Sequence, residues 1–256
     1  MQNKQAKIRT VAVIGYEPED FRDFLESKGL RKVTRNPDAV ISYGGDGTTL
    51  KTEHIFPGVP KICVRDWDVC PVCGPKSKKI DLPRRSGVQL CATCFERLLG
   101  RAIRGDYKII EEIKLVASAN AGGRKFSAEA LNEVQLHNLN PMQAVRFDLY
   151  LNGKLFQKDC VSDGVIISTP YGSTGYYYSV SGGKTFTKGI GIIQNNPKFA
   201  QKPTIITEHL DKFVLRGVVT RTKGLLFVDN LPRFAKLSQG DEFFVRKSKG
   251  TAKFIV

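Results

Sequence analysis

The chain has 256 residues, of which 41% are hydrophobic, and this is enough to fill the core of one large domain or two modest ones. Its longest apolar stretches, such as Val11–Ile14 and Val165–Ile167, are far shorter than the roughly 20 residues needed to cross a bilayer, so no membrane-spanning helix is expected. The formal net charge of +15 favours polyanionic partners, but the basic residues are scattered and the charge alone selects none of them.

The first residues of the sequence are not expected to act as a signal peptide. Thr10–Gly15 is too short for the apolar region of a signal peptide, and acidic residues follow it directly. We therefore expect a cytoplasmic protein that uses no membrane partner.

The first part of the chain, residues 1–106, alternates between strand and helix patterns. Such alternation predicts an α/β domain with a Rossmann-like parallel sheet. Strands are predicted at Val11–Ile14, Ala39–Tyr43 and Pro60–Val64, and helices at Pro18–Lys28 and Phe95–Arg104.

The second part, residues 107–256, reads as predominantly β. Short alternating segments lie between turn residues such as Asn152-Gly153, which is a typical hairpin turn. Strands are predicted at Lys114–Ser118, Arg146–Leu151, Gly164–Ser168, Thr204–Ile206, Phe213–Val219, Leu225–Val228 and Glu242–Arg246.

A glycine-rich turn follows the buried strand Ala39–Tyr43. Gly44, Gly45 and Gly47 allow backbone N–H groups to approach phosphate oxygens without obstruction by side chains. Asp46 would repel a bare phosphate, so its presence there fits a nearby metal ion or a role as proton acceptor, as in phosphoryl transfer. A glycine turn that merely connects a strand to a helix is the structural alternative.

Four segments together carry a specific resemblance. They are Ile41-Ser42-Tyr43-Gly44-Gly45-Asp46-Gly47-Thr48, Leu131-Asn132-Glu133-Val134, the run Ser162–Tyr176 and Ser181-Gly182-Gly183. In order and spacing the chain resembles the NAD kinase family from about Val11 to Gly183, and more weakly to its end. Diacylglycerol-type lipid kinases share the glycine-aspartate loop, but there an Asn-Glu pair follows almost immediately.

The resemblance implies a kinase that transfers a phosphoryl group from ATP or inorganic polyphosphate to the 2′-hydroxyl of the adenosine ribose of NAD, forming NADP. It implies Mg²⁺ or another divalent cation with the donor, and a homodimer or homotetramer. Asp46 would accept the proton of the hydroxyl, and the phosphate-binding residues would be Gly44, Gly45, Gly47 and Thr48. The NAD-binding residues would be Asn132, Glu133, Asp163, Thr174, Gly175, Tyr176 and Ser179.

Several positions depart from the family pattern. Val161 stands where a basic residue is common, Gly175 replaces an alanine, and Asp229-Asn230-Leu231 replaces Asp-Gly-Gln. The loop Pro197–Pro203 is shortened, and no counterpart of the family's final helix is expected within these 256 residues. These differences affect what can be expected for the phosphoryl donor, the affinity for substrate and the oligomeric state.

Two Cys-x2-Cys pairs, separated by 17 residues in a chain expected in the cytosol, predict a structural zinc site in an insertion at about 65–97. Its ligands would be Cys70, Cys73, Cys91 and Cys94. The zinc-ribbon-like insertion follows the third strand, so we expect it within reach of the nucleotide. Its basic residues either contact the phosphoryl donor or are simply solvated: Lys76, Lys78, Lys79, Arg84 and Arg85.

Two rival functions are weighed against an NAD kinase. A nucleic-acid-binding zinc-ribbon protein on an inactive kinase scaffold would fit the basic charge, but the intact Asp46 and Asn132-Glu133 argue against it. A lipid kinase is disfavoured by the distant Asn-Glu pair. Cys63, Cys160 and the three histidines are expected to be buried or incidental.

Overall fold

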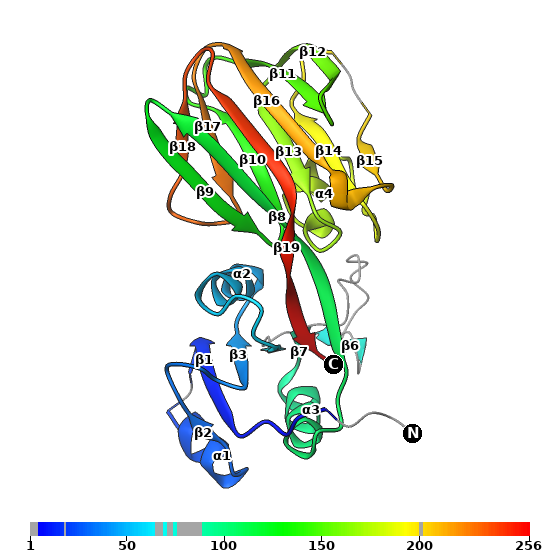
Figure 1. Cartoon of the computed structure of the whole chain (residues 1–256). Helices are drawn as coiled ribbons and strands as arrows, with labels where there is room; N and C mark the ends of the chain where they lie inside the picture. Colours follow the sequence, from blue (N-terminus) through cyan, green and yellow to red (C-terminus); the bar gives the residue numbers. More distant parts are fainter. Residues whose placement is uncertain (1–4, 18, 65–68, 71–73, 76–88, 200–201) are drawn as a thin grey trace. The chain divides into compact units, whose positions relative to one another are not determined.

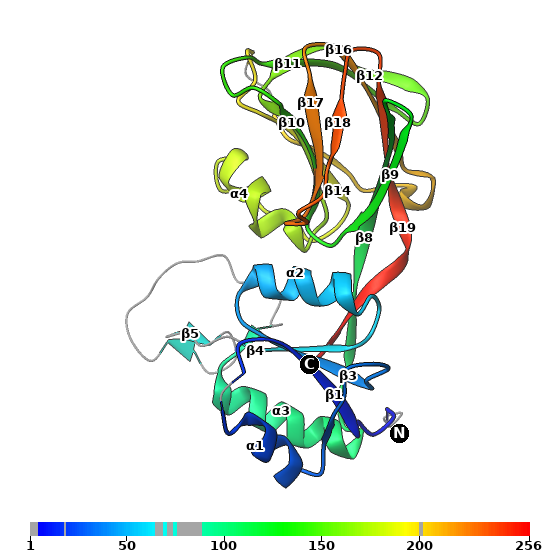
Figure 2. The same ribbon diagram turned by 90° about the vertical axis from the view of Figure 1, so that its left-hand side faces the viewer.

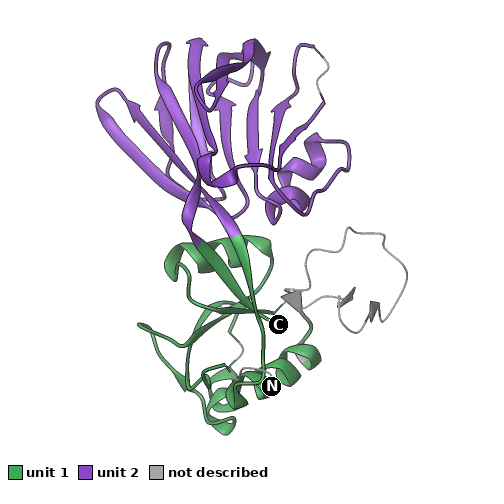
Figure 3. Cartoon of the chain, turned by 45° about the vertical axis from the view of Figure 1, so that its right-hand side comes forward, with its two compact units in different colours: residues 1–112, 251–256 green, residues 113–250 purple. Residues whose placement is uncertain are grey.

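The structure is a computed structural model, and Figure 3 shows its two compact units. The first unit comprises Met1–Glu112 and Thr251–Val256, and the second comprises Ile113–Gly250. The chain therefore passes to the second unit a few residues beyond the division proposed from the sequence, and its C-terminal residues return to the first. The structure describes residues 5–17, 19–64, 69–70, 74–75, 89–199 and 202–256.

The first unit is built on a parallel sheet, as the alternating strands and helices predict. Adjacent strands pair in the order β7-β4-β3-β1-β2, all parallel, and the end of β19 pairs with β4 through Phe254. The strands are β1 (Thr10–Gly15), β2 (Arg31–Lys32), β3 (Ala39–Tyr43), β4 (Lys61–Val64) and β7 (Gln89–Leu90).

Helices cover both faces of this sheet (Figure 2). On one face, α1 (Phe21–Ser27) and α3 (Ala92–Arg104) pack their apolar side chains against the sheet in a single buried cluster. On the other face lies α2 (Asp46–Ile55), whose buried residues are mostly polar and include Thr49, Thr52 and Glu53. Gly105 ends α3 in the left-handed conformation, as expected for a glycine that follows a helix.

A buried ion pair fixes α2 to the sheet. The side chains of Lys61, on β4, and Glu53, on α2, form a salt bridge at 0% and 2% exposure. The Lys61 ammonium also donates to the carbonyl oxygens of Val59 (2.7 Å) and Phe56 (3.2 Å). The backbone N–H of Gly58 donates to Glu53 at 3.1 Å. Because both charges have several partners, the pair can be accommodated without water.

The second unit is a sandwich of two antiparallel sheets (Figure 1). In the first sheet β12, β11, β16 and β19 are neighbours, with β8 and β9 continuing from β19. Its strands are β8 (Ile109–Ala121), β9 (Arg124–Ala130), β11 (Val145–Leu151), β12 (Lys154–Ser162), β16 (Val214–Arg221) and β19 (Glu242–Ile255). Strands β8 and β19 also extend into the first unit.

The second sheet of the sandwich has the order β15-β14-β13-β10-β17-β18. Residues that alternate along its strands, such as Val134 and Leu136 or Val165 and Ile167, enter the core that the two sheets share. Its strands are β10 (Glu133–Asn138), β13 (Gly164–Ser168), β14 (Ile190–Asn195), β15 (Thr204–Ile206), β17 (Gly224–Val228) and β18 (Ala235–Leu237).

The remaining elements are short. Two-residue strands β5 (Val69–Cys70) and β6 (Gly74–Pro75) pair as a small antiparallel ladder. Helix α4 (Tyr176–Val180) covers the outer face of the second sheet through Ile166, Tyr177 and Ile193. Two 3₁₀ turns complete the list, η1 (Gly172–Thr174) and η2 (Leu210–Lys212). Within the part of the chain that the structure describes, no helix is long and apolar enough to cross a membrane.

The buried ion pair yields a stability prediction. Glu53→Gln leaves the Lys61 ammonium buried without its counter-ion, and we expect the free energy of unfolding to fall by about 3–5 kcal/mol. The double replacement Glu53→Leu with Lys61→Met removes both charges and is expected to cost less than the single change. Urea denaturation of both variants measures the difference, and a more stable single variant would contradict the prediction.

Candidate functional site

The glycine-rich turn of the first unit lies at the carboxyl end of β3 and opens α2. Gly45 occupies the position before the helix, and Asp46 is its first residue. Gly44 has a φ of +154°, and a Cβ atom there would lie 2.4 Å from the Thr48 hydroxyl oxygen. The predicted residues Gly44 and Gly45 therefore join β3 to α2, which begins with Asp46, Gly47 and Thr48, and a larger residue at 44 does not fit.

The neighbouring strand approaches this turn just as closely. Gly15 ends β1 with a φ of +108°, and a Cβ atom at this position would lie 2.1 Å from the carbonyl oxygen of Tyr43. The N–H of Tyr16 donates to the same carbonyl at 2.9 Å. Two parallel strands thus deliver glycine backbone to the start of α2, where the helix macrodipole favours negative charge.

Small polar side chains fill the space between α2 and the sheet. Thr49, on α2, is fully buried and lies 3.5 Å from the Ser42 hydroxyl and 3.8 Å from the Cys63 sulfur. Burial raises the pKa of the Cys63 thiol to about 12. The thiol is therefore neutral and forms part of the packing, as expected from the sequence.

In the second unit, the chain crosses from one sheet to the other at Leu131 and Asn132, between β9 and β10. The carboxylate of Asp229 accepts three consecutive backbone N–H groups at this corner. They are those of Leu131 (2.8 Å), Asn132 (2.8 Å) and Glu133 (3.1 Å). This role of Asp229 was not predicted from the sequence, because the three bonds link positions almost a hundred residues apart.

The carbonyl groups of the same corner are held by the segment after β13. The hydroxyl of Thr169 donates to the carbonyl of Leu131 at 2.6 Å, and its N–H donates to that of Asn132 at 2.9 Å. Gly172 packs so closely that a Cβ atom would lie 2.2 Å from the carbonyl oxygen of Asn132. The predicted motifs around Asn132 and after Ser168 are therefore in direct contact.

Asn132 and Glu133 are both buried, at 6% and 5% exposure. The Oδ1 atom of Asn132 is buried and has no hydrogen-bond partner among the described residues. Gln135 donates to Glu133 at 3.2 Å. A Cβ atom on Gly175 would lie 3.3 Å from Asn132 Nδ2 and 3.6 Å from Glu133 Oε2, so Gly175 borders both side chains. An amide and a carboxylate are thus presented side by side, in a geometry suited to sugar hydroxyls or base edges.

Asp163 lies at the other end of the same strand pair. In the antiparallel register Glu133 is opposite Ser168, whereas His137 is opposite Gly164. Asp163 accepts hydrogen bonds from the side-chain amides of Asn138 (3.3 Å) and Asn196 (3.0 Å). The predicted NAD-binding residues of the second unit therefore form two groups, separated by about 17 Å of strand.

The other predicted residues lie on or just before α4. The hydroxyl of Thr174 faces the carbonyl of Tyr171 at 3.5 Å, and Ser179 is exposed on the helix. Tyr176 reaches towards the Asp163 group, because its hydroxyl accepts a hydrogen bond from Asn195 at 2.8 Å. Helix α4 thus connects the two groups along the outer face of the sheet.

The four cysteines of the predicted zinc site are only partly described. Cys91 precedes α3 and the buried Cys94 lies in its first turn, while the backbone of Cys70 belongs to β5. Cys73 and the basic residues of the insertion lie outside the described residues. Among the residues that are described, no group of three or more His, Cys, Asp or Glu side chains could hold a metal ion.

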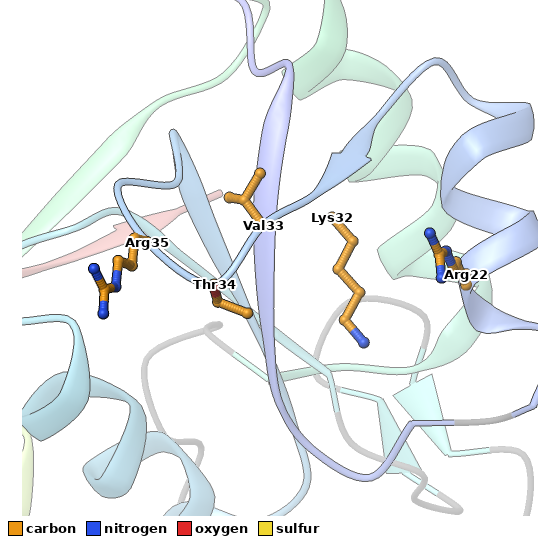
Figure 4. A pocket seen from close by; sticks show the side chains of 5 residues that line it. All are labelled: Arg22, Lys32, Val33, Thr34 and Arg35. Atoms are coloured by element: carbon orange, nitrogen blue, oxygen red, sulfur yellow. The ribbon is translucent and has the colours of Figure 1, made fainter.

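A surface depression of about 480 Å³ lies beside β2 in the first unit (Figure 4). Two of its three cations already have carboxylate partners, because Arg22 pairs with Glu26 and Lys32 with Glu17. It contains none of the residues predicted to bind a ligand, and we assign it no function. The lining residues are Arg22, Lys32, Val33, Thr34 and Arg35.

Comparison with known proteins finds a family model and relatives of similar sequence. Residues 131–256 match the family model of the ATP-NAD kinase C-terminal domain. The chain is 27% identical over 262 residues to a bifunctional NADP phosphatase/NAD kinase of Methanococcus maripaludis, covering 91% of this chain and 43% of that protein. It is 28% identical over 235 residues to an NAD kinase of Thermoplasma acidophilum, covering 91% and 78%.

Among solved structures, the fold is similar to that of yeast NADH kinase complexed with NADH. The TM-score is 0.76 at 16% sequence identity, and the match covers 98% of this chain and 84% of the yeast chain. The chain spans less than half of the Methanococcus maripaludis relative and most of the Thermoplasma acidophilum one. Residues 131–256 therefore match the ATP-NAD kinase C-terminal domain, the chain is similar to curated NAD kinases, and its fold is similar to that of a solved NADH kinase.

Proposed function

We propose that the chain is an NAD kinase, a phosphotransferase that moves a phosphoryl group from ATP or inorganic polyphosphate to the 2′-hydroxyl of the adenosine ribose of NAD. The observation that carries the proposal is the turn at the start of α2. There, glycines at the ends of two parallel strands pack closely against the start of α2, where the helix macrodipole favours a phosphate group next to Asp46. The match of residues 131–256 to the ATP-NAD kinase C-terminal domain supports NAD as the acceptor.

Asp46 acts mainly by orienting the acceptor hydroxyl. A ribose hydroxyl is a far weaker acid than a carboxylic acid, whose ordinary pKa is about 3.9, so Asp46 does not deprotonate it in advance. The proton instead moves to Asp46 late, when the hydroxyl oxygen is already bonding to a loose, metaphosphate-like phosphorus centre. The carboxylate of Asp46 is also a suitable hard ligand for Mg²⁺ or another divalent cation, which would offset charge on the donor phosphates.

In the second unit, Asn132 and Glu133 are proposed to bind ribose and base groups of NAD. The buried Oδ1 of Asn132 offers an acceptor that no described residue uses, and the glycine at 175 leaves space beside it. Asp163 would accept from an exocyclic amine or amide. Because about 17 Å of strand separate it from Glu133, it serves either the far end of an extended dinucleotide or, in a homodimer or homotetramer, the site of a neighbouring subunit.

Replacement of Asp46 tests the reaction. Purified protein incubated with NAD, Mg²⁺ and either ATP or polyphosphate is expected to form NADP. Asp46→Asn should lower kcat by about three orders of magnitude or more while dinucleotide binding persists, because the hydroxyl loses its orienting acceptor. Asp23→Asn is the matched control, since it also removes an aspartate from the first turn of a helix but lies on α1. Full turnover by Asp46→Asn would show that a residue other than Asp46 accepts the proton of the ribose hydroxyl.

We further propose that Cys70, Cys73, Cys91 and Cys94 hold a structural zinc ion in the insertion. The described part of the site fits this metal in two respects. Cys91 and Cys94 lie three residues apart at the N-terminus of α3, where anionic thiolates are favoured. In addition, Arg97 donates to the Cys94 sulfur at 3.6 Å, as expected for a thiolate ligand.

Metal analysis with cysteine variants tests the zinc proposal. We expect about one zinc ion per chain, lost in Cys91→Ser and Cys94→Ser because four thiolates are needed to close the tetrahedron. Cys63→Ser and Cys160→Ser are the matched controls and should retain the metal. Both controls are buried cysteines outside the insertion, Cys63 on β4 and Cys160 on β12, and burial raises the pKa of their thiols to about 12 and about 11. Zinc that survives both ligand substitutions would disprove the assignment.

A further inference from the structure

The corner at Leu131–Glu133 poses a specific hydrogen-bonding problem. Here the chain leaves β9 in one sheet and enters β10 in the other, so successive N–H groups cannot all be satisfied by one strand ladder. A buried N–H group without an acceptor destabilises the fold. The Asp229 carboxylate accepts three such groups at 2.8, 2.8 and 3.1 Å, and so satisfies the corner with a single side chain.

Asp229 is itself held in an unusual conformation that directs its side chain to this corner. It follows β17, whose last residue, Val228, pairs with Val134 of β10. Its φ is +47°, in the left-handed region that aspartate tolerates better than most residues do. Its own N–H donates to the carbonyl of Glu133 at 3.0 Å. Asp229 and Glu133 are therefore joined by two hydrogen bonds, and each residue donates its backbone N–H in one of them.

The donors and acceptors of the corner are thus fixed by different segments. Asp229 takes the N–H groups, while Thr169 donates to the carbonyls of Leu131 and Asn132. The side chains of Asn132 and Glu133 start from backbone that is held on both sides. The directions in which these two side chains point therefore depend on the backbone hydrogen bonds of the corner as well as on side-chain contacts.

We propose that Asp229 is a positioning residue for NAD binding, which acts by fixing the backbone from which Asn132 and Glu133 project. The inference rests on the proposed function, because it assigns Asn132 and Glu133 to the dinucleotide. Asparagine at 229 would keep the shape but replace one oxygen by an NH₂ group, which faces a backbone N–H and repels it. The corner then shifts, and the two ligand-binding side chains shift with it.

Asp38 provides a matched control in the first unit. Its carboxylate also accepts consecutive backbone N–H groups, those of Arg9 and Thr10, both at 2.8 Å. It lies at the start of the parallel strands, whereas Asp46 follows their carboxyl ends. Asp38→Asn therefore reproduces the loss of a carboxylate that binds backbone amides without affecting the corner.

The test compares steady-state kinetics of Asp229→Asn, Asp229→Glu and Asp38→Asn. We expect Asp229→Asn to raise the KM for NAD about tenfold or more, with the KM for the phosphoryl donor changed by less than about twofold. Asp38→Asn should leave both KM values within about twofold of those of the wild type, even if it lowers Tm by as much as Asp229→Asn does. If Asp229→Asn does not fold, Asp229→Glu, which retains the charge on a longer side chain, is expected to show the same selective rise in the KM for NAD.

A double-mutant cycle with Glu133→Gln separates positioning from general stability. If Asp229 acts through the corner, the double variant should bind NAD about as weakly as Glu133→Gln alone. An unchanged KM for NAD in Asp229→Asn, or fully additive losses in the cycle, would overturn the proposal. If the wild-type protein forms no NADP, the proposed function fails. Calorimetric titration of the wild type, Asp229→Asn and Asp38→Asn with NAD then still decides the role of Asp229, because only Asp229→Asn should lose affinity.

Discussion

Buried backbone N–H groups need acceptors, and this constraint governs the second unit. A two-sheet sandwich requires the chain to cross between sheets, and each crossing takes amides out of a strand ladder. At residues 131–133 the crossing is satisfied by Asp229, which directly follows a strand almost a hundred residues later. The side chains best suited to bind a ligand start at this crossing, so the bonds that stabilise the fold also define the shape of the site.

The first unit meets a different constraint, because its site depends on close approach of backbone rather than on a carboxylate. Gly15 and Gly44 occupy positions where a Cβ atom would overlap neighbouring atoms, and both lie where the parallel strands end. Such packing is possible only if α2 is held close to the sheet. The buried Lys61–Glu53 pair and the small side chains of Ser42 and Thr49 permit this approach.

The regular elements were largely predictable, because apolar side chains dominate their buried faces. The predicted strand Ala39–Tyr43 is observed with the same bounds, and the predicted helix Phe95–Arg104 is the greater part of α3. Helix α2 was not predicted, because its buried face carries Thr49, Thr52 and Glu53 instead of an apolar stripe. Hydrophobic periodicity gives no signal for a helix that packs through polar groups.

The candidate site was predictable in its residue types but not in its organisation. The motifs around Asp46 and Asn132 could be recognised because their residues are contiguous in the sequence. The role of Asp229 could not, because it depends on the pairing of β17 with β10 and on a left-handed backbone. The separation of Asp163 from Glu133 likewise follows from an antiparallel register, which the sequence does not specify.

That register also explains why the outer face of β10 is polar. Val134 and Leu136 enter the core, so Glu133, Gln135 and His137 project from the opposite face, which α4 partly covers. At its far end the Asn138 amide donates to Asp163 and to the carbonyl of Gln143, so its oxygen faces His137 Nδ1 at 2.6 Å.

His137 therefore carries a proton on Nδ1, since an amide oxygen only accepts hydrogen bonds. The histidine expected to be incidental instead links Asn138 to Asn195, which lies 3.5 Å from its Nε2 atom and donates to the Tyr176 hydroxyl. Polar side chains thus continue along β10 from Glu133 to the group around Asp163. A ligand held at both ends of this strand would lie along hydrogen-bonding groups throughout its length, as the two polar halves of a dinucleotide require.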